Sequence, residues 1–361
     1  MEINAILNIP PYSLNRTEKR KLLNERMRYL TTHHYQHSEM YRKMMNAVEL
    51  DINNLPEYDS LPFLPVRLFK EVELLSVNKE NITKTMTSSG TTGQQVSKIF
   101  IDKDTSLNQT KALTKIVSSF IGKKRLPMLI IDSTSVLKNR NMFSARGAGI
   151  LGFSMFASKK EFALDDEMNL NVSVVEDFLE NNKNTPIFIF GFTFMIWQHF
   201  YKQLEISGYR PDLTNGILIH GGGWKKLLSE SVSSEVFKRK LNEVCGIHTG
   251  NIHDYYGMVE QTGAIHMECE MGHLHAPVFS EILIRRPLDF SLADYNEKGI
   301  IEVLSVLPES YPGHILLTED EGMILGEDDC PCGRKGKYFK IFGRITNAEI
   351  RGCSDTYATK F

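Results

Sequence analysis

Segments that cross or enter a membrane are missing from the sequence. The longest strongly apolar stretch, residues 187–197, contains Gly191 and is shorter than the roughly 20 apolar residues that a transmembrane helix needs. Residues 1–20 mix polar and charged side chains, so they lack the apolar run of a signal peptide. We therefore expect a cytoplasmic protein with no membrane span.

The number of cysteines and the net charge are also low. The chain holds five cysteines among 361 residues. An odd number without a signal peptide argues against a disulfide framework and for free thiols, metal ligation or catalysis. The 42 basic and 44 acidic side chains give a net charge of −2. Because binding nucleic acid would require a basic stripe, we expect no nucleic-acid partner.

What the sequence does contain is the alternation of an α/β protein. Three apolar runs predict buried strands at 127–132, 186–190 and 216–220. Each run is followed by a turn bearing Gly or Ser and then by a helical pattern, as at 224–242. This order predicts mostly parallel sheets flanked by helices, with ligands bound at the carboxyl ends of the strands.

The two ends of the chain differ from this middle part. Residues 14–48 predict an amphipathic helical start, and a second helix is expected near 67–75. After Pro277 the pattern becomes β-rich, with apolar runs at 282–284, 299–303 and 314–318. We therefore expect four parts: an N-terminal helical region (1–84), an α/β core (85–276), a smaller β subdomain (277–342), and a terminal motif with a flexible tail (343–361).

A loop rich in hydroxyls and glycine opens the α/β core. It comprises Ser88, Ser89, Gly90, Thr91, Thr92 and Gly93. Backbone N–H groups and hydroxyls of such a loop donate to phosphate oxygens, and glycine lets the backbone approach an anion closely. A surface turn has the same composition, so composition alone does not decide between the two. The loop is not a Walker loop, because no Gly-Lys-Ser/Thr ends it.

The order of the residues favours a phosphate-binding loop. Ser-Ser-Gly-Thr-Thr-Gly followed by a lysine resembles the phosphate-binding signature of the adenylate-forming superfamily, the acyl-CoA synthetases and adenylation domains. Four further segments resemble motifs of that superfamily and follow in the same order. They are Gly221–Trp224, Tyr255–Glu260, Leu317–Asp320 and Gly343–Gly352.

The resemblance implies ATP-dependent activation of a carboxylic acid as an acyl adenylate. It assigns ATP binding to the loop and to Lys98, Gly221, Gly222, Gly223, Tyr256, Gly257, Asp320 and Arg344. Asp320 and Arg344 would contact the ribose, and Glu260 would ligate Mg²⁺ near the α-phosphate, since a hard cation prefers oxygen donors. The sequence departs from the family pattern in three ways: no Pro-Lys follows the loop, Val259 stands in place of a threonine, and the hinge motif is one residue short.

The last part of the chain resembles one particular family more specifically. The segment from Cys330 to Tyr357 resembles the acyl-protein synthetases of the bacterial luminescence fatty-acid reductase complex, the LuxE family, and the similarity extends over nearly the whole chain. In that family a long-chain fatty acid is adenylated and then held as a thioester on a cysteine near the C-terminus. It next passes to an acyl reductase, which uses NADPH. By position the acylated residue here is Cys353, and the implied partners are the acyl reductase and an acyl transferase subunit.

Two other functions stay open. One is an acyl- or aryl-CoA ligase, which is disfavoured because only nine residues follow Gly352 and could not form the small C-terminal domain of the superfamily with its catalytic lysine. The other is a catalytically degenerate subunit of a reductase complex, which Val259 and the displaced Lys98 keep in consideration.

Four side chains could form a structural zinc site. Cys269 and His275 are six positions apart, and Cys330 and Cys332 form a Cys-x-Cys pair. Together they can supply a tetrahedral set of thiolates and imidazole, with His273 as a substitute ligand. Reduced cysteines in a β subdomain are the alternative. The pattern resembles that of phenylacetate-CoA-ligase-like proteins, which bind a structural Zn²⁺.

An aromatic segment could contact the fatty acyl chain. Phe190, Gly191 and Phe192 lie in it, and a long acyl chain needs an apolar pocket. A core strand running into a buried helix accounts for the same aromatic side chains equally well.

Overall fold

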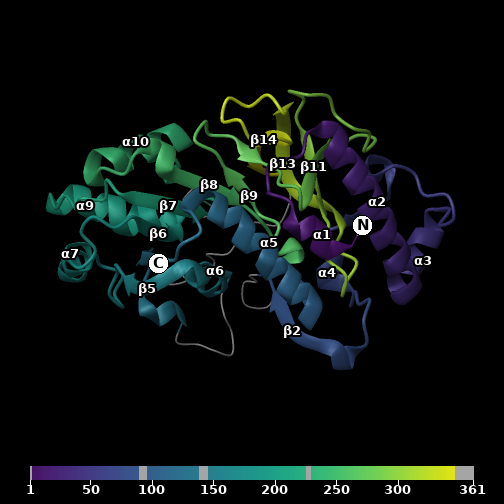
Figure 1. Cartoon of the computed structure of the whole chain (residues 1–361), viewed down its shortest axis with the longest axis horizontal. Coiled ribbons are helices and arrows are strands. Elements are labelled where there is room, and N and C mark those ends of the chain that lie inside the picture. The colour runs from purple at the N-terminus through teal and green to yellow at the C-terminus, as the bar shows by residue number, and fades with distance from the viewer. Residues whose placement is uncertain (1, 89–95, 138–144, 225–228, 346–361) are drawn as a thin grey trace.

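A parallel sheet forms one half of the computed structural model, which describes residues 2–88, 96–137, 145–224 and 229–345 (Figure 1). Its strands, in spatial order, are β5 (Ala157–Phe162), β4 (Leu126–Ile131), β6 (Ile187–Phe192), β7 (Gly216–Gly221) and β8 (Ile252–Tyr256). The predicted strands at 127–132, 186–190 and 216–220 are β4, β6 and β7. Nearly all their side chains are buried, which explains why these strands read as continuous apolar runs.

The same sheet continues past β8 with antiparallel pairing. The further strands, in spatial order, are β9 (His266–Glu268), β10 (Leu274–His275), β14 (Lys337–Arg344), β13 (Ile315–Glu327), β12 (Gly299–Ser305) and β11 (Ser280–Arg285), while β1 (Leu64–Pro65) pairs in parallel with β13. The β-rich part after Pro277 is therefore continuous with the parallel strands through hydrogen bonds. The α/β fold class is confirmed, and the domain boundaries stay a prediction.

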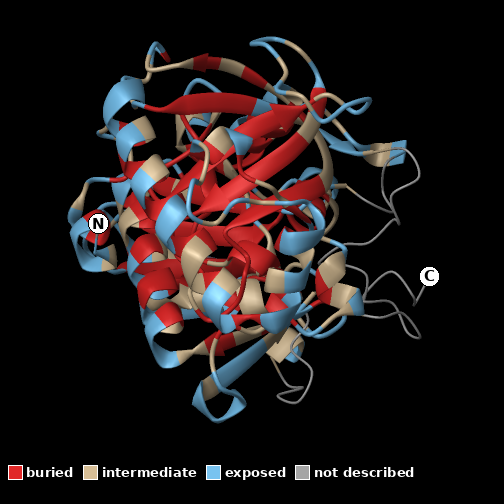
Figure 2. Ribbon diagram, turned by 90° about the vertical axis from the view of Figure 1, so that its right-hand side faces the viewer, coloured by how far each residue is buried: buried red, intermediate tan, exposed pale blue. Residues whose placement is uncertain are grey.

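Helices cover both faces of the parallel half. Met128 and Ile130 of β4 pack towards α5 (Lys103–Ile121) and α6 (Ala145–Phe153). Leu129 and Ile131 pack on the opposite face, because side chains alternate along a strand. The helices over that face are α7 (Val172–Glu180), the π-helix Ile196–Tyr201, α9 (Lys202–Ser207) and α10 (Ser234–Cys245), whereas Phe194 and Met195 of the short α8 (Thr193–Met195) pack with the first face. Figure 2 shows the buried strands inside and the exposed faces of the helices outside.

Three helices lie beside the antiparallel half (Figure 1), and the last two of them form the helical start predicted at 14–48. They are α1 (Ile3–Asn8), α2 (Arg16–His37) and α3 (Glu39–Ala47). A capping box starts α2, because the side chains of Asn15 and Glu18 each accept a hydrogen bond from the backbone N–H of the other residue. The buried Lys19 donates to the Ala276 carbonyl at 3.0 Å, which ties α2 to the sheet.

Two predicted helices are shorter than expected. The helix expected near 67–75 is only α4 (Leu68–Glu71), because Val72 turns to an extended conformation. The helix expected over 224–242 begins at Ser234, where Ser233 caps it by accepting from the Val236 N–H. Serine is a typical capping residue, but the helical pattern of the residues before Ser233 predicted an earlier start of the helix.

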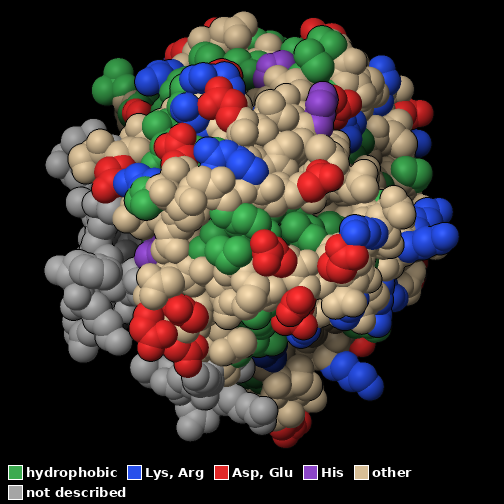
Figure 3. Space-filling model, turned by 90° about the vertical axis from the view of Figure 1, so that its left-hand side faces the viewer, with side chains coloured by type: hydrophobic (Ala, Val, Ile, Leu, Met, Phe, Trp, Pro, Cys, Tyr) green, Lys and Arg blue, Asp and Glu red, His purple; other side chains and the backbone are tan. Residues whose placement is uncertain are grey.

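The surface carries both signs of charge. On the face shown in Figure 3, Lys and Arg side chains are interspersed with Asp and Glu, and small apolar patches lie between them. Within the described ranges, no helix combines the length and the apolarity that spanning a bilayer requires.

Candidate functional site

The predicted glycine-rich segment lies at the carboxyl edge of the parallel strands. Gly221 ends β7, and a Cβ there would lie 2.4 Å from Cε1 of Tyr255 on the neighbouring β8. Gly222 has φ +78°, and a Cβ on it would lie 3.0 Å from Cδ1 of Phe192 at the end of β6. Glycine is thus required for the backbone to pass between two aromatic rings. A Cβ on Gly223 would meet no atom within 4 Å.

Three predicted ATP-binding residues, Tyr256, Asp320 and Arg344, come together across the junction of the two halves. The Tyr256 hydroxyl at the end of β8 donates to Asp320 Oδ2 at 2.8 Å. The β13–β14 register places Asp320 opposite Arg344, and Arg344 Nε lies 4.0 Å from Asp320 Oδ1. Burial raises the pKa of Tyr256 well above its usual value, so its hydroxyl stays protonated and donates. The arrangement presents a carboxylate and a guanidinium side by side.

Glu260 lies near the same place and is buried, with 6 % of its surface exposed. It occupies the 3₁₀ turn Val259–Gln261, just after Gly257, where a Cβ would come within 2.9 Å of Ile265 Cγ2. Burial raises the pKa of the Glu260 carboxyl, while the Ser97 side chain and then the charges of Lys70 and Arg344 oppose this shift. When ionised, the Glu260 carboxylate supplies the kind of oxygen donor that a hard cation prefers.

A hairpin carries the two ends of the hydroxyl-rich loop. Its strands β2 (Ile82–Thr87) and β3 (Lys98–Asp102) are antiparallel, and Thr87 pairs with the exposed Lys98. Ser88 donates its N–H to the Ser97 carbonyl at 3.2 Å, and its Oγ accepts from the Ser97 N–H at 2.9 Å. Ser89, Gly90, Thr91, Thr92 and Gly93 lie outside the described residues.

The hairpin contacts the turn that bears Glu260. The Thr262 hydroxyl lies 3.7 Å from the sulfur of Met86 in β2. The hairpin that carries the hydroxyl-rich loop therefore packs on the Glu260 turn. This turn follows shortly after the end of β8, where Tyr256 lies.

The predicted acyl-pocket residues divide between the two faces of the sheet. Phe190 stacks on Phe153 of α6 with ring centroids 4.4 Å apart, and Phe192 lies edge-on to Phe190. A Cβ on Gly191 would instead lie 2.9 Å from Ile196 Cγ1 on the opposite face. The structure therefore brings Phe190 and Phe192 together and sets Gly191 apart from them. The reason is that β6 continues through Phe192, so its alternation includes all three residues.

The four predicted metal ligands form one cluster. The ligand atoms of Cys269, His275, Cys330 and Cys332 all lie within 4.8 Å of one another. The Cys269 and Cys330 sulfurs are 4.0 Å apart, and Cys332 Sγ is 3.4 Å from His275 Nε2. The substitute ligand His273 has its Nδ1 3.3 Å from Cys330 Sγ. Cys245 is buried at the end of α10, away from this cluster, in the hydrophobic core.

One buried ion pair at the strand ends was missed by sequence reasoning. Asp132 directly follows β4, and its Oδ2 lies 3.0 Å from Nε of Arg146 in α6. Burial raises the pKa of Asp132 to about 6, against the opposing charge of Arg146. An acidic residue directly after a predicted buried strand is a signal that could have identified Asp132, but nothing local identifies Arg146 as its partner.

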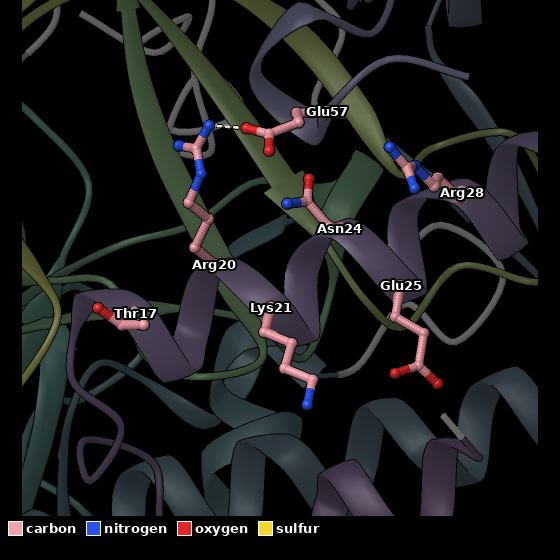
Figure 4. A pocket seen from close by; sticks show the side chains of 7 residues that line it. All are labelled: Thr17, Arg20, Lys21, Asn24, Glu25, Arg28 and Glu57. Carbon is pink, nitrogen blue, oxygen red and sulfur yellow. Dashed lines mark hydrogen bonds and ion pairs between the residues drawn. The ribbon is translucent and has the colours of Figure 1, made fainter. Parts of the chain in front are cut away.

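A surface groove of about 620 Å³ lies elsewhere, along the exposed side of α2 (Figure 4). An ion pair between Arg20 and Glu57 crosses it. The groove is lined by Thr17, Arg20, Lys21, Asn24, Glu25, Arg28 and Glu57. None of the residues predicted for the site lines it, so the candidate site is the carboxyl edge of the strands rather than this groove.

The chain is similar to known proteins over nearly its full length. Two curated relatives are long-chain-fatty-acid–luciferin-component ligases, from Aliivibrio fischeri and Vibrio harveyi. They are 23% and 20% identical to it, each over 97% of this chain and over 92% and 91% of their own lengths. A third ligase of that name, from Photorhabdus luminescens, is 41% identical over 61 residues, which are 17% of this chain and 52% of the relative.

The fold is also that of solved ligases. The structure of a 2-hydroxyisobutyryl-CoA ligase in an open conformation, in complex with 2-HIB-AMP and CoA, superposes with a TM-score of 0.68 at 14% identity. The match covers 94% of this chain and 78% of that ligase, and it shows a shared fold. A family model described as acyl-protein synthetase, LuxE, matches residues 2–361. The chain therefore belongs to the LuxE family of acyl-protein synthetases.

Proposed function

We propose that this chain uses ATP and Mg²⁺ to activate a long-chain fatty acid as an acyl adenylate, with release of pyrophosphate. The observation that carries the proposal is the hydrogen bond from Tyr256 to Asp320 with Arg344 alongside. It joins the parallel half of the sheet to the antiparallel half at the place where Glu260 and the glycine edge also lie. The names of the relatives and the family support the choice of fatty acid as substrate.

The residues would divide the work of adenylation. Asp320 accepts from the ribose hydroxyls and Arg344 contacts the same sugar, while the loop 88–93 and Lys98 hold the phosphates. The adenine would lie against the backbone of Gly221, Gly222 and Gly223, between Tyr256–Gly257 and the ends of the strands. Bound through Glu260, Mg²⁺ would neutralise charge on the phosphate oxygens. Catalysis of this step is mainly positioning and electrostatic stabilisation, because the fatty carboxylate itself attacks the α-phosphorus and displaces pyrophosphate.

The acyl chain would lie on the face of the sheet that Phe190 and Phe192 share with α6. A Cβ on Gly149 of α6 would lie 3.1 Å from Cζ of Phe192, so the helix approaches this ring closely. Phe153 and Phe190 provide further apolar surface there. An apolar wall next to the glycine edge would place the carboxylate end of the chain towards ATP.

We propose that Cys353 then takes the acyl group. Its thiolate attacks the acyl carbonyl carbon, the carbon–sulfur bond forms, the bond to the phosphate oxygen breaks, and AMP leaves. The thioester would pass to a cysteine of an acyl reductase, with an acyl transferase as a further subunit of the complex. Cys353 lies outside the described residues, so this step rests on the resemblance of the C-terminal segment.

A labelling experiment tests the second step. The protein is incubated with radiolabelled myristate and ATP, as wild type, as Cys353→Ser and as Cys245→Ser, a matched control at a buried cysteine. The proposal predicts label that hydroxylamine releases from the wild type and the control, and none on Cys353→Ser. Label that persists on Cys353→Ser would contradict the assigned nucleophile, and rapid transfer to added coenzyme A would favour a CoA ligase.

We also propose that the cysteine–histidine cluster binds a structural Zn²⁺. Its donors fit the ion: thiolates and an imidazole are zinc's preferred ligands. With zinc–sulfur bonds of roughly 2.3 Å, a tetrahedral site separates its ligand atoms by about 3.8 Å. The 4.0 Å between the Cys269 and Cys330 sulfurs is close to this value, and the 3.4 Å between the Cys332 sulfur and the His275 nitrogen is shorter, as the shorter zinc–nitrogen bond of roughly 2.1 Å requires. Cys269, His275, Cys330 and Cys332 would hold the ion, with no part in the chemistry of the adenylate.

A further inference from the structure

The loop 308–314, between β12 and β13, is buried and lies between the elements of the candidate site. Ser310 and Tyr311 are fully buried, with no exposed surface. Ser310 donates its hydroxyl to the Phe100 carbonyl of β3 at 2.9 Å, and its N–H to Thr105 Oγ1 at the start of α5 at 3.2 Å. The loop is thus fixed to the hairpin that carries the hydroxyl-rich loop.

The same loop also holds the Glu260 turn. The Tyr311 hydroxyl donates to the Glu260 carbonyl oxygen at 2.8 Å. The Gln261 side-chain amide donates to the Gly313 carbonyl at 2.8 Å and to the Val303 carbonyl at 3.1 Å. All these groups are buried, so each hydrogen bond fixes the backbone of the turn without competition from water.

Glycine at position 313 permits this contact. A Cβ there would lie 2.3 Å from Cε2 of Tyr311 and 3.1 Å from the Glu260 carbonyl oxygen. The backbone of the loop can therefore approach the Glu260 turn only without a side chain. Gln109 of α5 adds a longer contact of 3.4 Å to the Tyr311 hydroxyl.

We propose that Tyr311 is a positioning residue: through the Glu260 carbonyl it sets the place of the Glu260 carboxylate relative to the phosphate-binding hairpin. This inference rests on the proposed role of Glu260 as a Mg²⁺ ligand. Mg²⁺ demands near-ideal octahedral geometry at about 2.1 Å, so a small displacement of a ligating oxygen weakens its binding. The Tyr311 ring packs edge-on to Phe69 at 6.0 Å and would stay in place when only the hydroxyl is removed.

The test is Tyr311→Phe, assayed by fatty-acid-dependent pyrophosphate–ATP exchange over a range of free Mg²⁺ at saturating ATP. Losing one neutral hydrogen bond should raise the half-saturating Mg²⁺ about fivefold. The half-saturating fatty acid should not change. Tyr201→Phe is the matched control, because Tyr201 is a buried tyrosine that stacks on Trp197 on the opposite face of the sheet.

The outcomes separate this inference from the proposed function. A merely structural role would lower the amount of active protein and scale the rate equally at every Mg²⁺ concentration, without moving the half-saturating value. Wild-type exchange with an unchanged Mg²⁺ requirement in Tyr311→Phe would overturn the inference and leave the function standing. No exchange by the folded wild type would overturn the function itself. Should Tyr311→Phe fail to fold, Gln261→Met breaks the other link, and an unshifted Mg²⁺ requirement there would overturn the inference.

Discussion

At the scale of single residues, the site depends on close approaches that few side chains allow. Tyr256 and Asp320 meet at 2.8 Å although they belong to different halves of the sheet. Gly221 and Gly222 pass between Tyr255 and Phe192. The motifs predicted which residues would gather here, but they could not predict the Asp132–Arg146 pair or the contact of Tyr311 with Glu260, because neither contact has a local pattern in the sequence.

Replacing Asp320 by Asn tests the ribose side of the site. The change keeps the size of the side chain and removes the charge that accepts from Tyr256 and faces Arg344. A charge-assisted hydrogen bond to ATP would be lost, so kcat/KM for ATP in the exchange reaction should fall about 10- to 100-fold. Asp294→Asn is the control, because its side chain is 90% exposed. Equal activity of the two variants would argue against a role for Asp320.

Adding a methyl group at Gly221 tests the close approach at the end of β7. Gly221→Ala would bring a Cβ within 2.4 Å of the Tyr255 ring, so strand or ring must shift. Overpacking of this kind costs about 1–3 kcal/mol of unfolding free energy, and exchange activity should fall with it. Gly152→Ala in α6 is the control, since a Cβ there meets nothing within 4 Å. Urea unfolding checks both, and a stable, fully active Gly221→Ala would contradict the account.

At the scale of elements, the parallel strands could be predicted and their antiparallel continuation could not. Strands β4, β6 and β7 were found as apolar runs because both their faces are buried. The joining of β9, β10 and β14 depends on pairing between distant segments, such as Leu274 with Phe339. Such pairing has no signal in local composition. The predicted acyl pocket grouped Gly191 with Phe190 and Phe192 because β6 was expected to end at Phe190. The strand continues for two more residues, to Phe192, so Gly191 lies on the opposite face of the sheet.

The cysteine–histidine cluster should hold two of these elements together. Cys269 directly follows β9 and His275 lies in β10, while Cys330 and Cys332 lie between β13 and β14. Cys330→Ser should abolish binding of about one Zn²⁺ per chain and lower the unfolding free energy. Elemental analysis and urea unfolding measure both effects, with Cys245→Ser as the control. Purified wild-type protein without zinc, and no more stable after zinc is added, would contradict this prediction.

At the scale of the whole molecule, several histidines are buried in the neutral form. Burial lowers the pKa of His314 to about 3 and that of His34 well below its usual value, and their rings lie 4.8 Å apart between α2 and the loop 308–314. Burial likewise lowers the pKa of His220 and of His266 to about 3. Below pH 6.5, therefore, the unfolded chain binds protons that the folded chain does not. The free energy of unfolding consequently decreases as the pH is lowered.

The unfolding free energy should consequently decrease between about pH 7.5 and 5.5. Each such histidine contributes about 1.4 kcal/mol to the loss, since its ordinary pKa is near 6.5 and its folded pKa lies far below this range. His314→Gln should make the loss between these two pH values smaller by about this amount. Urea unfolding at both pH values checks the loss, and equal losses in the wild type and His314→Gln would contradict the prediction.

The central claim about this chain is that it forms an acyl adenylate. It is tested most directly by the exchange of labelled pyrophosphate into ATP in the presence of Mg²⁺ and myristate or palmitate. We predict exchange that requires the fatty acid, persists in Cys353→Ser because the thiol acts only after adenylation, and falls strongly in Glu260→Gln. Folded wild-type protein that shows no fatty-acid-dependent exchange would contradict the account.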